Sequence, residues 1–338
     1  MSELRIGVLG AGVVGLTTAL QLQETFRQAK VDVIADKFNT DTTSYVAAGI
    51  FRPGTSFCGP DDATTSKWVN DSYSYWDELR GGREAANAGI THLSGYIFSS
   101  KSANIVRNHL IEHLVPLYRR ATEAELRICP GDWKYGSFFT TILTETARFL
   151  PWATERFKQN AGRLVKKEIA SFRDLHGGAY DVVVNCAGLG AKQLCNDHKL
   201  VPIRGQVIKV KANWLKTFFY GDYDTYVIPG FNSVTLGGCR NYDSYDTTVS
   251  KYDSLAIRER CEALVPSLKT APAVAEYVGL RPHRDPVRVE RETLRCEGQS
   301  MKVVHNYGHG GYGVTTAPGT AKHAVRLVVE ALSGSSKL

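Results

Sequence analysis

The sequence predicts an α/β protein in which a parallel sheet with covering helices is interleaved along the chain with a second, mostly antiparallel β domain. Three observations predict this class. An apolar run turns through glycines into a helical stretch at 4–27, a continuous apolar run ends in glycines at 181–190, and alternating segments recur between 201 and 236. Continuous apolar runs are typical of buried parallel strands, whereas alternation of apolar and polar residues is typical of antiparallel strands with one exposed face.

The N-terminal segment has the layout of a dinucleotide-binding βαβ unit. Gly10 permits a tight turn, Gly12 lets the backbone approach a pyrophosphate, and Gly15 allows close packing of the helix on the strand. A second strand over 31–35 is followed by Asp36, 21 residues after Gly15, where a carboxylate can accept a ribose hydroxyl. Because strand, turn, helix, second strand and acid follow in order, we predict a Rossmann-like nucleotide site rather than a turn without a ligand.

The middle of the chain predicts one helix and then a series of strands. The helix covers 62–80, with Asp62 as its N-cap and Gly81-Gly82 as its stop. Strands are expected over 201–210, 225–229 and 233–236, separated by Gly, Asn and Asp turns. The buried run at 181–188 returns the chain to the parallel sheet, so we expect the nucleotide domain to be discontinuous in sequence.

A second glycine cluster lies at 303–315, where a strand leads into a glycine loop and then into a helix starting near Pro318. Proline is tolerated in the first turn of a helix because its missing N–H has no intrahelical partner there. The positive end of such a helix can stabilise negative charge on a reduced flavin ring. A purely structural turn is the alternative interpretation of this segment.

Composition favours a globular protein of about two domains, since 338 residues are 43% hydrophobic and 22% charged. The formal charge of +7 comes from lysines and arginines dispersed among acids, which argues against nucleic acid and suits an anionic cofactor or substrate. No segment predicts a membrane span. The seven cysteines are scattered without a CxxC pair, so we expect reduced structural thiols and no metal site.

The last three residues, Ser336-Lys337-Leu338, match the address that the peroxisomal import receptor recognises. The preceding stretch at 333–335 is small and polar, which would keep the tripeptide accessible. We therefore expect localisation in the peroxisomal matrix, with the import receptor as a partner. Enzymes that release hydrogen peroxide are commonly kept there with catalase. The sequence leaves the oligomeric state open.

Together the motifs resemble those of the D-amino-acid oxidase and D-aspartate oxidase family of FAD flavoproteins over nearly the whole chain. The matching segments are GAGVVGL (10–16), DKF (36–38), TTS (42–44), VAAG (46–49), VNCAG (184–188), RGQ (204–206), VTLGG (234–238), GLRP (279–282) and HNYGHGGYG (305–313). The resemblance implies an FAD-binding domain over 1–50, 145–195 and 275–338, interleaved with a substrate domain over 51–144 and 196–274.

The resemblance also implies the chemistry. A D-amino acid gives its α-hydrogen as hydride to flavin N5, the imino acid hydrolyses, and dioxygen reoxidises the flavin to yield hydrogen peroxide. Orientation of one C–H bond then dominates over acid or base catalysis. The positions implied to bind FAD are Gly10, Ala11, Gly12, Val13, Val14, Gly15, Asp36, Lys37, Thr42, Thr43, Ser44, Gly49, Ile50, Ile169, Gly188, Gly310, Gly311, Gly313, Val314 and Thr315.

For the substrate, the resemblance assigns the α-carboxylate to Arg281, whose planar guanidinium matches it in a bidentate pair, and to the hydroxyl of Tyr226. The Gly311 carbonyl would accept the substrate amine. His309 is assigned no catalytic role, because a histidine in a glycine loop more often fixes that loop by hydrogen bonding.

Two further arginines bear on the choice of substrate. Arg240 falls where the acidic-substrate branch of the family carries an arginine, and Arg52 falls on the active-site side of the first loop. Because an unpaired buried carboxylate is costly, these cations favour D-aspartate and D-glutamate. Two departures qualify this expectation. Gly310 is followed by Gly311, as in the neutral branch, where the acidic branch tends to have serine. Asp222 replaces a tyrosine that often serves as a lid in the neutral branch, which puts the presence of a lid in doubt.

Three other functions stay open at this point. The same chemistry could act on neutral or basic D-amino acids, a question that Arg240 and Arg52 decide. A nicotinamide-dependent dehydrogenase would share the N-terminal motif but has no need of the C-terminal glycine loop. A catalytically silent nucleotide-binding protein would bind flavin without forming peroxide, which the retained Arg281 and Tyr226 disfavour.

Overall fold

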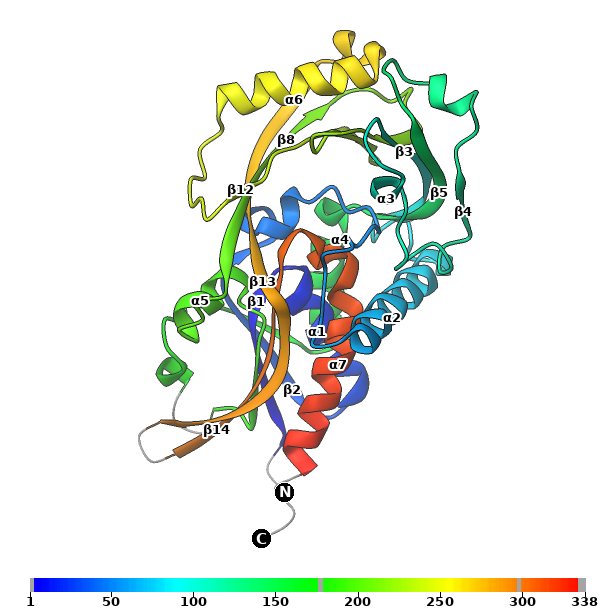
Figure 1. Cartoon of the computed structure of the whole chain (residues 1–338). Coiled ribbons are helices and arrows are strands. Elements are labelled where there is room, and N and C mark those ends of the chain that lie inside the picture. Colours follow the sequence, from blue (N-terminus) through cyan, green and yellow to red (C-terminus); the bar gives the residue numbers. More distant parts are fainter. Residues whose placement is uncertain (1–2, 176–178, 297–298, 334–338) are drawn as a thin grey trace.

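A computed structural model describes residues 3–175, 179–296 and 299–333, and its strands form one large sheet with two regions (Figure 1). The first region is parallel, in the order β14-β7-β1-β2-β6, and the second is mostly antiparallel. The parallel strands are β1 (Arg5–Ala11), β2 (Lys30–Phe38), β6 (Arg163–Lys166), β7 (Val182–Asn185) and β14 (Gln299–His309). They come from three separate stretches of sequence, as the prediction of interleaving requires. The exact domain boundaries stay a prediction.

The antiparallel region continues from β14 through β13 and β8 to β11, β10, β9, β3, β5 and β4. Its strands are β3 (Ile90–Ser99), β4 (Leu117–Arg120), β5 (Tyr135–Thr144), β8 (Val201–Val210), β9 (Thr217–Tyr220), β10 (Tyr226–Pro229), β11 (Val234–Gly237), β12 (Asn241–Tyr242) and β13 (Ala273–Cys296). The three strands expected between 201 and 236 are confirmed as β8, β10 and β11. One pair in this region, β3 with β9, is parallel.

Strand β13 joins the two regions because it pairs with different neighbours along its length. Its first part, from Ala273 to His283, pairs with β8, and its second part, from Arg288 to Cys296, pairs with β14. The register shifts between His283 and Arg288, where the strand changes partner. The substrate half and the nucleotide half of the sheet are thus continuous through one backbone segment.

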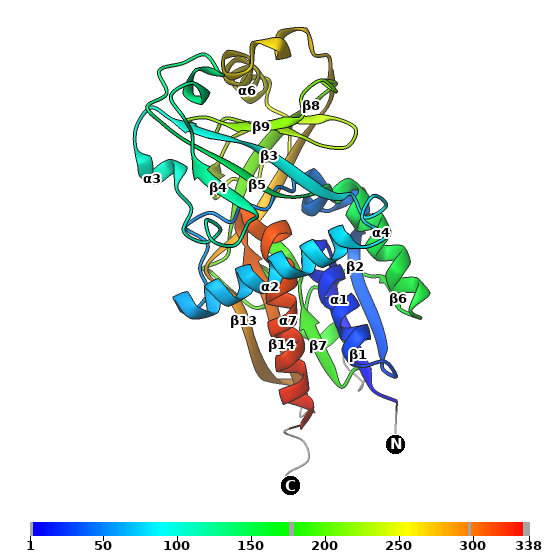
Figure 2. The same cartoon turned by 90° about the vertical axis from the view of Figure 1, so that its right-hand side faces the viewer.

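Three helices pack together beside the parallel strands (Figure 2). They are α1 (Val13–Thr25), α2 (Asp62–Gly81) and α7 (Gly313–Ser333), and the other helices are α3 (Ala103–Val106), α4 (Thr146–Gln159), α5 (Ala191–Leu194) and α6 (Lys251–Leu264). Short 3₁₀ segments include η1 (Asn39–Asp41), η2 (Thr43–Val46), η3 (Glu125–Arg127), η4 (Phe172–Leu175), η5 (Gly188–Gly190), η6 (Pro266–Thr270) and η7 (Gly310–Tyr312). In the described part of the chain, no helix combines the length and the hydropathy needed to cross a bilayer.

Two predicted helix boundaries were wrong. The N-cap of α2 is Asp61, which has an extended backbone and whose carboxylate accepts the Thr64 N–H at 2.7 Å, so Asp62 is already the first helical residue. Helix α7 begins at Gly313, which places Pro318 inside the helix rather than near its start. Pro318 has no N–H for the carbonyl of Val314, and the indole of Trp76 donates to that carbonyl at 3.2 Å instead.

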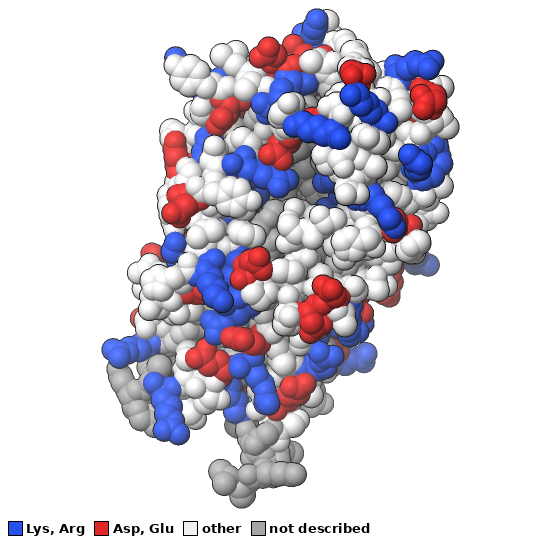
Figure 3. Space-filling view, viewed as in Figure 1, with Lys and Arg blue, Asp and Glu red and all other residues white. Residues whose placement is uncertain are grey.

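Charged side chains are mixed over the face seen in Figure 3, where Lys and Arg lie among Asp and Glu. Within the described ranges, no three His, Cys, Asp or Glu side chains lie close enough to hold a metal ion. Cys58, Cys129, Cys186, Cys195, Cys239 and Cys261 are free, and burial raises the pKa of the Cys129, Cys186 and Cys261 thiols to about 12. These three are therefore protonated, unreactive thiols. Ser336-Lys337-Leu338 lies outside the described residues.

Candidate active site

A cavity of about 1140 Å³ is lined by residues from both regions of the sheet. One end lies at the β1–α1 turn and the end of β2, and the other end lies among side chains of β8, β10 and β13. This volume exceeds the range of about 300–1,000 Å³ usual for a drug-sized ligand. The cavity is thus large enough for an elongated cofactor with a small substrate beside it.

The nucleotide end of the cavity is formed by the start of helix α1 and the exposed carboxylate of Asp36. Helix α1 starts after Gly12 with no side-chain N-cap, although the Val13 N–H donates to Ser44 Oγ at 3.0 Å. A Cβ on Gly12 would stand 3.0 Å from that same Oγ, so the residue has little room for a side chain. Asp36 is exposed and has no polar partner within the part of the chain described. These features fit the pyrophosphate and ribose of a dinucleotide such as FAD.

The flavin end of the cavity is formed by the glycine loop that enters α7. Gly310 has φ +57°, and the short η7 turn leads directly into the helix at Gly313. His309 is buried beneath this loop and hydrogen-bonds Thr320 on α7, with Nε2 and Oγ1 2.9 Å apart. Burial lowers the pKa of His309 to about 3, so the imidazole is neutral. His309 therefore anchors the loop to the helix, as expected from the sequence.

Most residues predicted to hold the cofactor come together along this cavity. The lining residues are Gly10, Ala11, Gly12, Val13, Val14, Asp36, Lys37, Thr42, Thr43, Ser44, Gly49, Ile50, Gly188, Gly310, Gly311, Gly313, Val314 and Thr315. Two do not line it. Gly15 lies beneath the turn, where a Cβ would stand 1.9 Å from the Gly10 carbonyl oxygen, and Ile169 packs against the apolar cluster that includes Leu9 and Phe172. The roles of these residues toward the cofactor stay predictions.

Arg281 lies flat over the backbone of β8 at the substrate end. A Cβ on Gly205 would stand 2.2 Å from the guanidinium nitrogens, so only glycine leaves room for this side chain. Arg281 Nη1 donates to the carbonyl of Cys239 at 3.1 Å, and Gly311 lies beside its aliphatic stem. No carboxylate pairs with Arg281 within the described residues. The guanidinium is held in place but its charge is not neutralised.

Tyr226, like Arg281, lies over glycine backbone that leaves room for its side chain. Its ring covers the Gly237–Gly238 backbone, where a Cβ on Gly237 would stand 2.0 Å from the ring. Burial raises the pKa of Tyr226, so the phenol stays protonated and can donate a hydrogen bond. The positive charge of Arg281 works against this rise in pKa.

The other two arginines reach the same end of the cavity in different ways. Arg52 stacks on the ring of Tyr220 with its guanidinium carbon 4.7 Å from the centroid, and its buried Nε has no hydrogen-bond partner among the residues described. Arg240 Nε pairs with Asp224 Oδ1 at 3.0 Å. The predicted substrate residues Tyr226, Arg281, Gly311, Arg240 and Arg52 therefore all line one end of the cavity.

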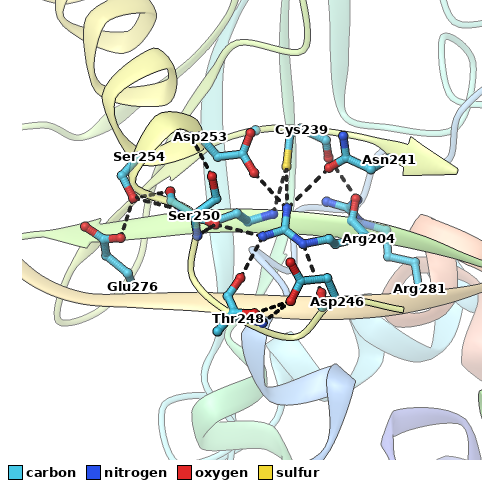
Figure 4. A network of polar contacts seen from close by, with 12 residues as sticks. Arg204, Cys239, Asn241, Asp246, Thr248, Ser250, Asp253, Ser254, Glu276 and Arg281 are labelled. Atoms are coloured by element: carbon cyan, nitrogen blue, oxygen red, sulfur yellow. Dashed lines mark hydrogen bonds and ion pairs between the residues drawn. The ribbon is translucent and has the colours of Figure 1, made fainter. Parts of the chain in front are cut away.

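Sequence reasoning missed the polar network behind Arg281, which centres on the buried Arg204 (Figure 4). Arg204 pairs with Asp253 at 2.7 Å and donates to the backbone carbonyls of Asp246 and Thr248 at 2.9 and 2.8 Å. Through these bonds it ties β8 to α6 and to the loop that precedes α6. Arg204 Nη1 also lies 3.8 Å from Cys239 Sγ, and the Cys239 carbonyl holds Arg281, so Arg204 is a positioning residue. The RGQ motif drew attention to Arg204, but its partners are distant in sequence.

Asp222, which stands where the neutral branch of the family carries a lid tyrosine, is buried and is hydrogen-bonded at the end of β3. It accepts from Ser99 Oγ at 2.9 Å, from Ser100 N–H at 3.1 Å and from Ser100 Oγ at 2.6 Å. These bonds lower the pKa of the carboxyl against the effect of its burial. Asp222 therefore anchors the turn between β9 and β10 rather than covering the cavity.

Two comparisons with known proteins show the family of the chain, and a third shows its fold. The chain matches the family described as DAO, FAD dependent oxidoreductase, over residues 5–327. It is 40% identical to the D-aspartate oxidase of Homo sapiens over 98% of this chain and 96% of that protein, and 31% identical to the D-amino acid oxidase of Dugesia ryukyuensis over 97% and 98%.

Among solved structures, the glycine oxidase of Bacillus cereus ATCC 14579 shares the fold with a TM-score of 0.78, at 16% identity over 97% of this chain and 95% of that one. The α/β fold with its large, mostly antiparallel sheet is thus confirmed as that of flavoprotein oxidases. The glycine-lined cavity, the family match and the curated relatives agree with one another, and the chain belongs to the family of FAD-dependent oxidoreductases, with FAD as its cofactor.

Proposed function

We propose that the protein oxidatively deaminates acidic D-amino acids, D-aspartate and D-glutamate, to the 2-oxo acid, ammonia and hydrogen peroxide. The observation that carries the proposal is the gathering of Arg281, Arg240 and Arg52 at one end of the cavity. A substrate with two carboxylates needs more than one cation, because a charge left unpaired on binding is costly. Relatives named D-aspartate oxidase support the same substrate class.

The geometry supports a mechanism that relies on orientation. Arg281 and the protonated hydroxyl of Tyr226 bind the α-carboxylate, and the Gly311 carbonyl accepts from the substrate amine. These contacts hold the amino acid at three points and so direct one C–H bond at the cofactor. When bound along the glycine-lined part of the cavity, FAD would supply the hydride acceptor and the reducing equivalents for dioxygen. His309 in the glycine loop is neutral and hydrogen-bonded to Thr320, so it stabilises the loop and does not act as a base.

The side-chain carboxylate of the substrate falls to the other two arginines. Arg52 is oriented by its stack on Tyr220 and keeps a buried Nε without a partner in the described chain. Arg240 lies within electrostatic range of Tyr226 and Tyr312, which also line the cavity. A guanidinium in such a setting binds a carboxylate in preference to an apolar group.

The first test is peroxide formation by the purified protein with D-aspartate, D-glutamate, D-alanine and D-arginine, and with L-aspartate as the stereochemical control. We expect kcat/KM to be highest for D-aspartate or D-glutamate. Replacing Arg240 with glutamine is expected to lower kcat/KM for the acidic substrates by about 10- to 100-fold, or about 1.4–2.7 kcal/mol, and to change D-alanine by less than about threefold.

Arg120→Gln is the matched control, because Arg120 is exposed and does not line the cavity. Equal losses for acidic and neutral substrates in Arg240→Gln would remove Arg240 from side-chain recognition. A wild-type preference for D-alanine or D-arginine would instead favour the neutral or basic substrates as the function of the same fold.

We also propose that the protein is imported into peroxisomes through Ser336-Lys337-Leu338. Containment of hydrogen peroxide with catalase supports this location for an oxidase. A fluorescent protein fused in front of residue 1 is expected to give a punctate pattern that coincides with a peroxisomal marker. Deleting the last three residues is expected to make the fluorescence diffuse. A diffuse pattern with the intact tripeptide contradicts the proposal.

A further inference from the structure

The turn between β9 and β10, residues 221–225, carries a carboxylate that faces the cavity. Asp224 pairs with Arg240 at 3.0 Å between Oδ1 and Nε, and both residues line the cavity. The side chains are 40% and 48% exposed, respectively, so the pair is only partly shielded from water. Ion pairs of this exposure are worth about 0–1 kcal/mol, which makes them exchangeable.

The backbone of this turn is fixed, so the exchange can involve the side chains alone. Asp222 is bound by Ser99 and Ser100, the Gly221 N–H donates to Thr225 at 2.9 Å, and the Gly238 N–H donates to the Asp224 carbonyl at 2.7 Å. Tyr223 and Asp224 have φ of +59° and +58°, in the left-handed region. Aspartate and asparagine adopt this region more readily than most residues. The turn thus presents the Asp224 carboxylate to Arg240 without closing over the cavity.

The pairing distinguishes Arg240 from its two neighbours. Arg281 is held by backbone carbonyls and Arg52 by the Tyr220 ring, and within the described residues neither pairs with a carboxylate. The other exposed acids that line the cavity, Asp36 and Asp41, belong to the β2 end where the nucleotide is expected. Of the two cations assigned to the second carboxylate of the substrate, Arg240 is therefore the one that already has an internal carboxylate.

We propose that Asp224 is a specificity-determining residue that occupies Arg240 as an internal counter-ion and yields it to the side-chain carboxylate of an acidic substrate. This inference rests on the proposed function, because it assumes that Arg240 binds that carboxylate. Two carboxylates compete for one guanidinium, so the apparent affinity for a dicarboxylate is reduced by the fraction of enzyme in which Asp224 holds Arg240. A monocarboxylate leaves the pair intact and carries no such cost. Asp224 thereby narrows the preference for acidic over neutral ligands.

The test is Asp224→Asn, which removes the charge, keeps the size and tolerates the left-handed backbone. Binding is measured on the FAD-loaded enzyme from the change in visible flavin absorption during titration with succinate or butyrate, which differ by one carboxylate. We expect the Kd for succinate to fall about threefold to fivefold, the gain expected when a weak competing pair is removed. The Kd for butyrate should stay within about twofold or rise. The KM for D-aspartate should fall together with the Kd for succinate, while kcat stays near the wild-type value.

Asp132→Asn is the matched control, because the Asp132 side chain is 91% exposed and does not line the cavity. It removes the same charge and should change neither Kd, nor the KM, nor kcat by more than about 1.5-fold. Added salt should weaken the effect of Asp224→Asn more than that of the control. An unchanged or raised Kd for succinate in Asp224→Asn overturns the proposal, since Asp224 would then only position Arg240. The proposed function fails separately, if the wild-type enzyme prefers D-alanine to D-aspartate and butyrate to succinate.

Discussion

Replacing Arg281 with alanine is expected to lower kcat/KM for every amino acid substrate by about 1,000-fold, which corresponds to about 4 kcal/mol. The reason is geometric as well as electrostatic. Gly205 leaves space for the guanidinium and the Cys239 carbonyl fixes its direction, so no other cation can take over its position. The loss should be similar for D-aspartate and D-alanine, because both carry the α-carboxylate. Steady-state peroxide formation measures it.

Arg281→Lys separates charge from shape. A lysine keeps the positive charge but lacks the planar fork, so we expect recovery of only a small part of the lost rate. Visible absorption of the purified variants should still show bound flavin, because the guanidinium contacts backbone carbonyls of the substrate half. The assignment of Arg281 to the α-carboxylate would be wrong if Arg281→Ala kept kcat/KM within tenfold of wild type. It would also be wrong if the variant lost activity toward D-aspartate alone.

The second large effect is expected at Gly15, in the turn that receives the nucleotide. In Gly15→Ala the new Cβ would stand 1.9 Å from the Gly10 carbonyl oxygen, which is backbone and has no flexible side chain to move. Helix α1 must then shift away from β1, and its free N–H groups lose their direction toward the pyrophosphate. We expect FAD affinity to fall by at least about tenfold. The ratio of absorbance at flavin and protein wavelengths, and titration of apoprotein with FAD, measure the loss.

Gly81→Ala is the control for Gly15→Ala. Gly81 ends α2, and no heavy atom lies within 4 Å of the position that its Cβ would take. This variant should retain flavin and unfold at a temperature equal to or slightly above that of wild type, since alanine favours the helix. Full flavin occupancy with unchanged affinity in Gly15→Ala would contradict the tight approach of α1 to β1.

The parts of the fold that were predictable depend on constraints within a short segment. Gly10 has φ +98°, a conformation that side chains disfavour, and this requirement is visible in the sequence as a glycine. The alternation over β8, β10 and β11 likewise marked strands, although the structure buries both faces of these strands instead of leaving one exposed. The start of α7 was not predictable, because the carbonyl freed by Pro318 is satisfied by Trp76 from another helix.

The substrate end shows the same division. Arg281, Tyr226, Arg240 and Arg52 could be nominated because the glycine motifs around them resemble a known family. Asp224 could not, since nothing local in the sequence shows that its left-handed backbone brings a carboxylate to Arg240. The role of Arg204 could not be predicted either, because it depends on backbone carbonyls that are distant from Arg204 in sequence.

Strand β13 has a consequence for how such an enzyme can diversify. Strand β13 is hydrogen-bonded to β8 up to His283 and to β14 from Arg288 onward, and His283 pairs with both, so the two halves share one strand. The reacting centre is therefore built on this shared strand, while the groups that discriminate between substrates project from turns beside it. Substitutions in these turns can therefore change the substrate selectivity while the oxidation reaction stays the same.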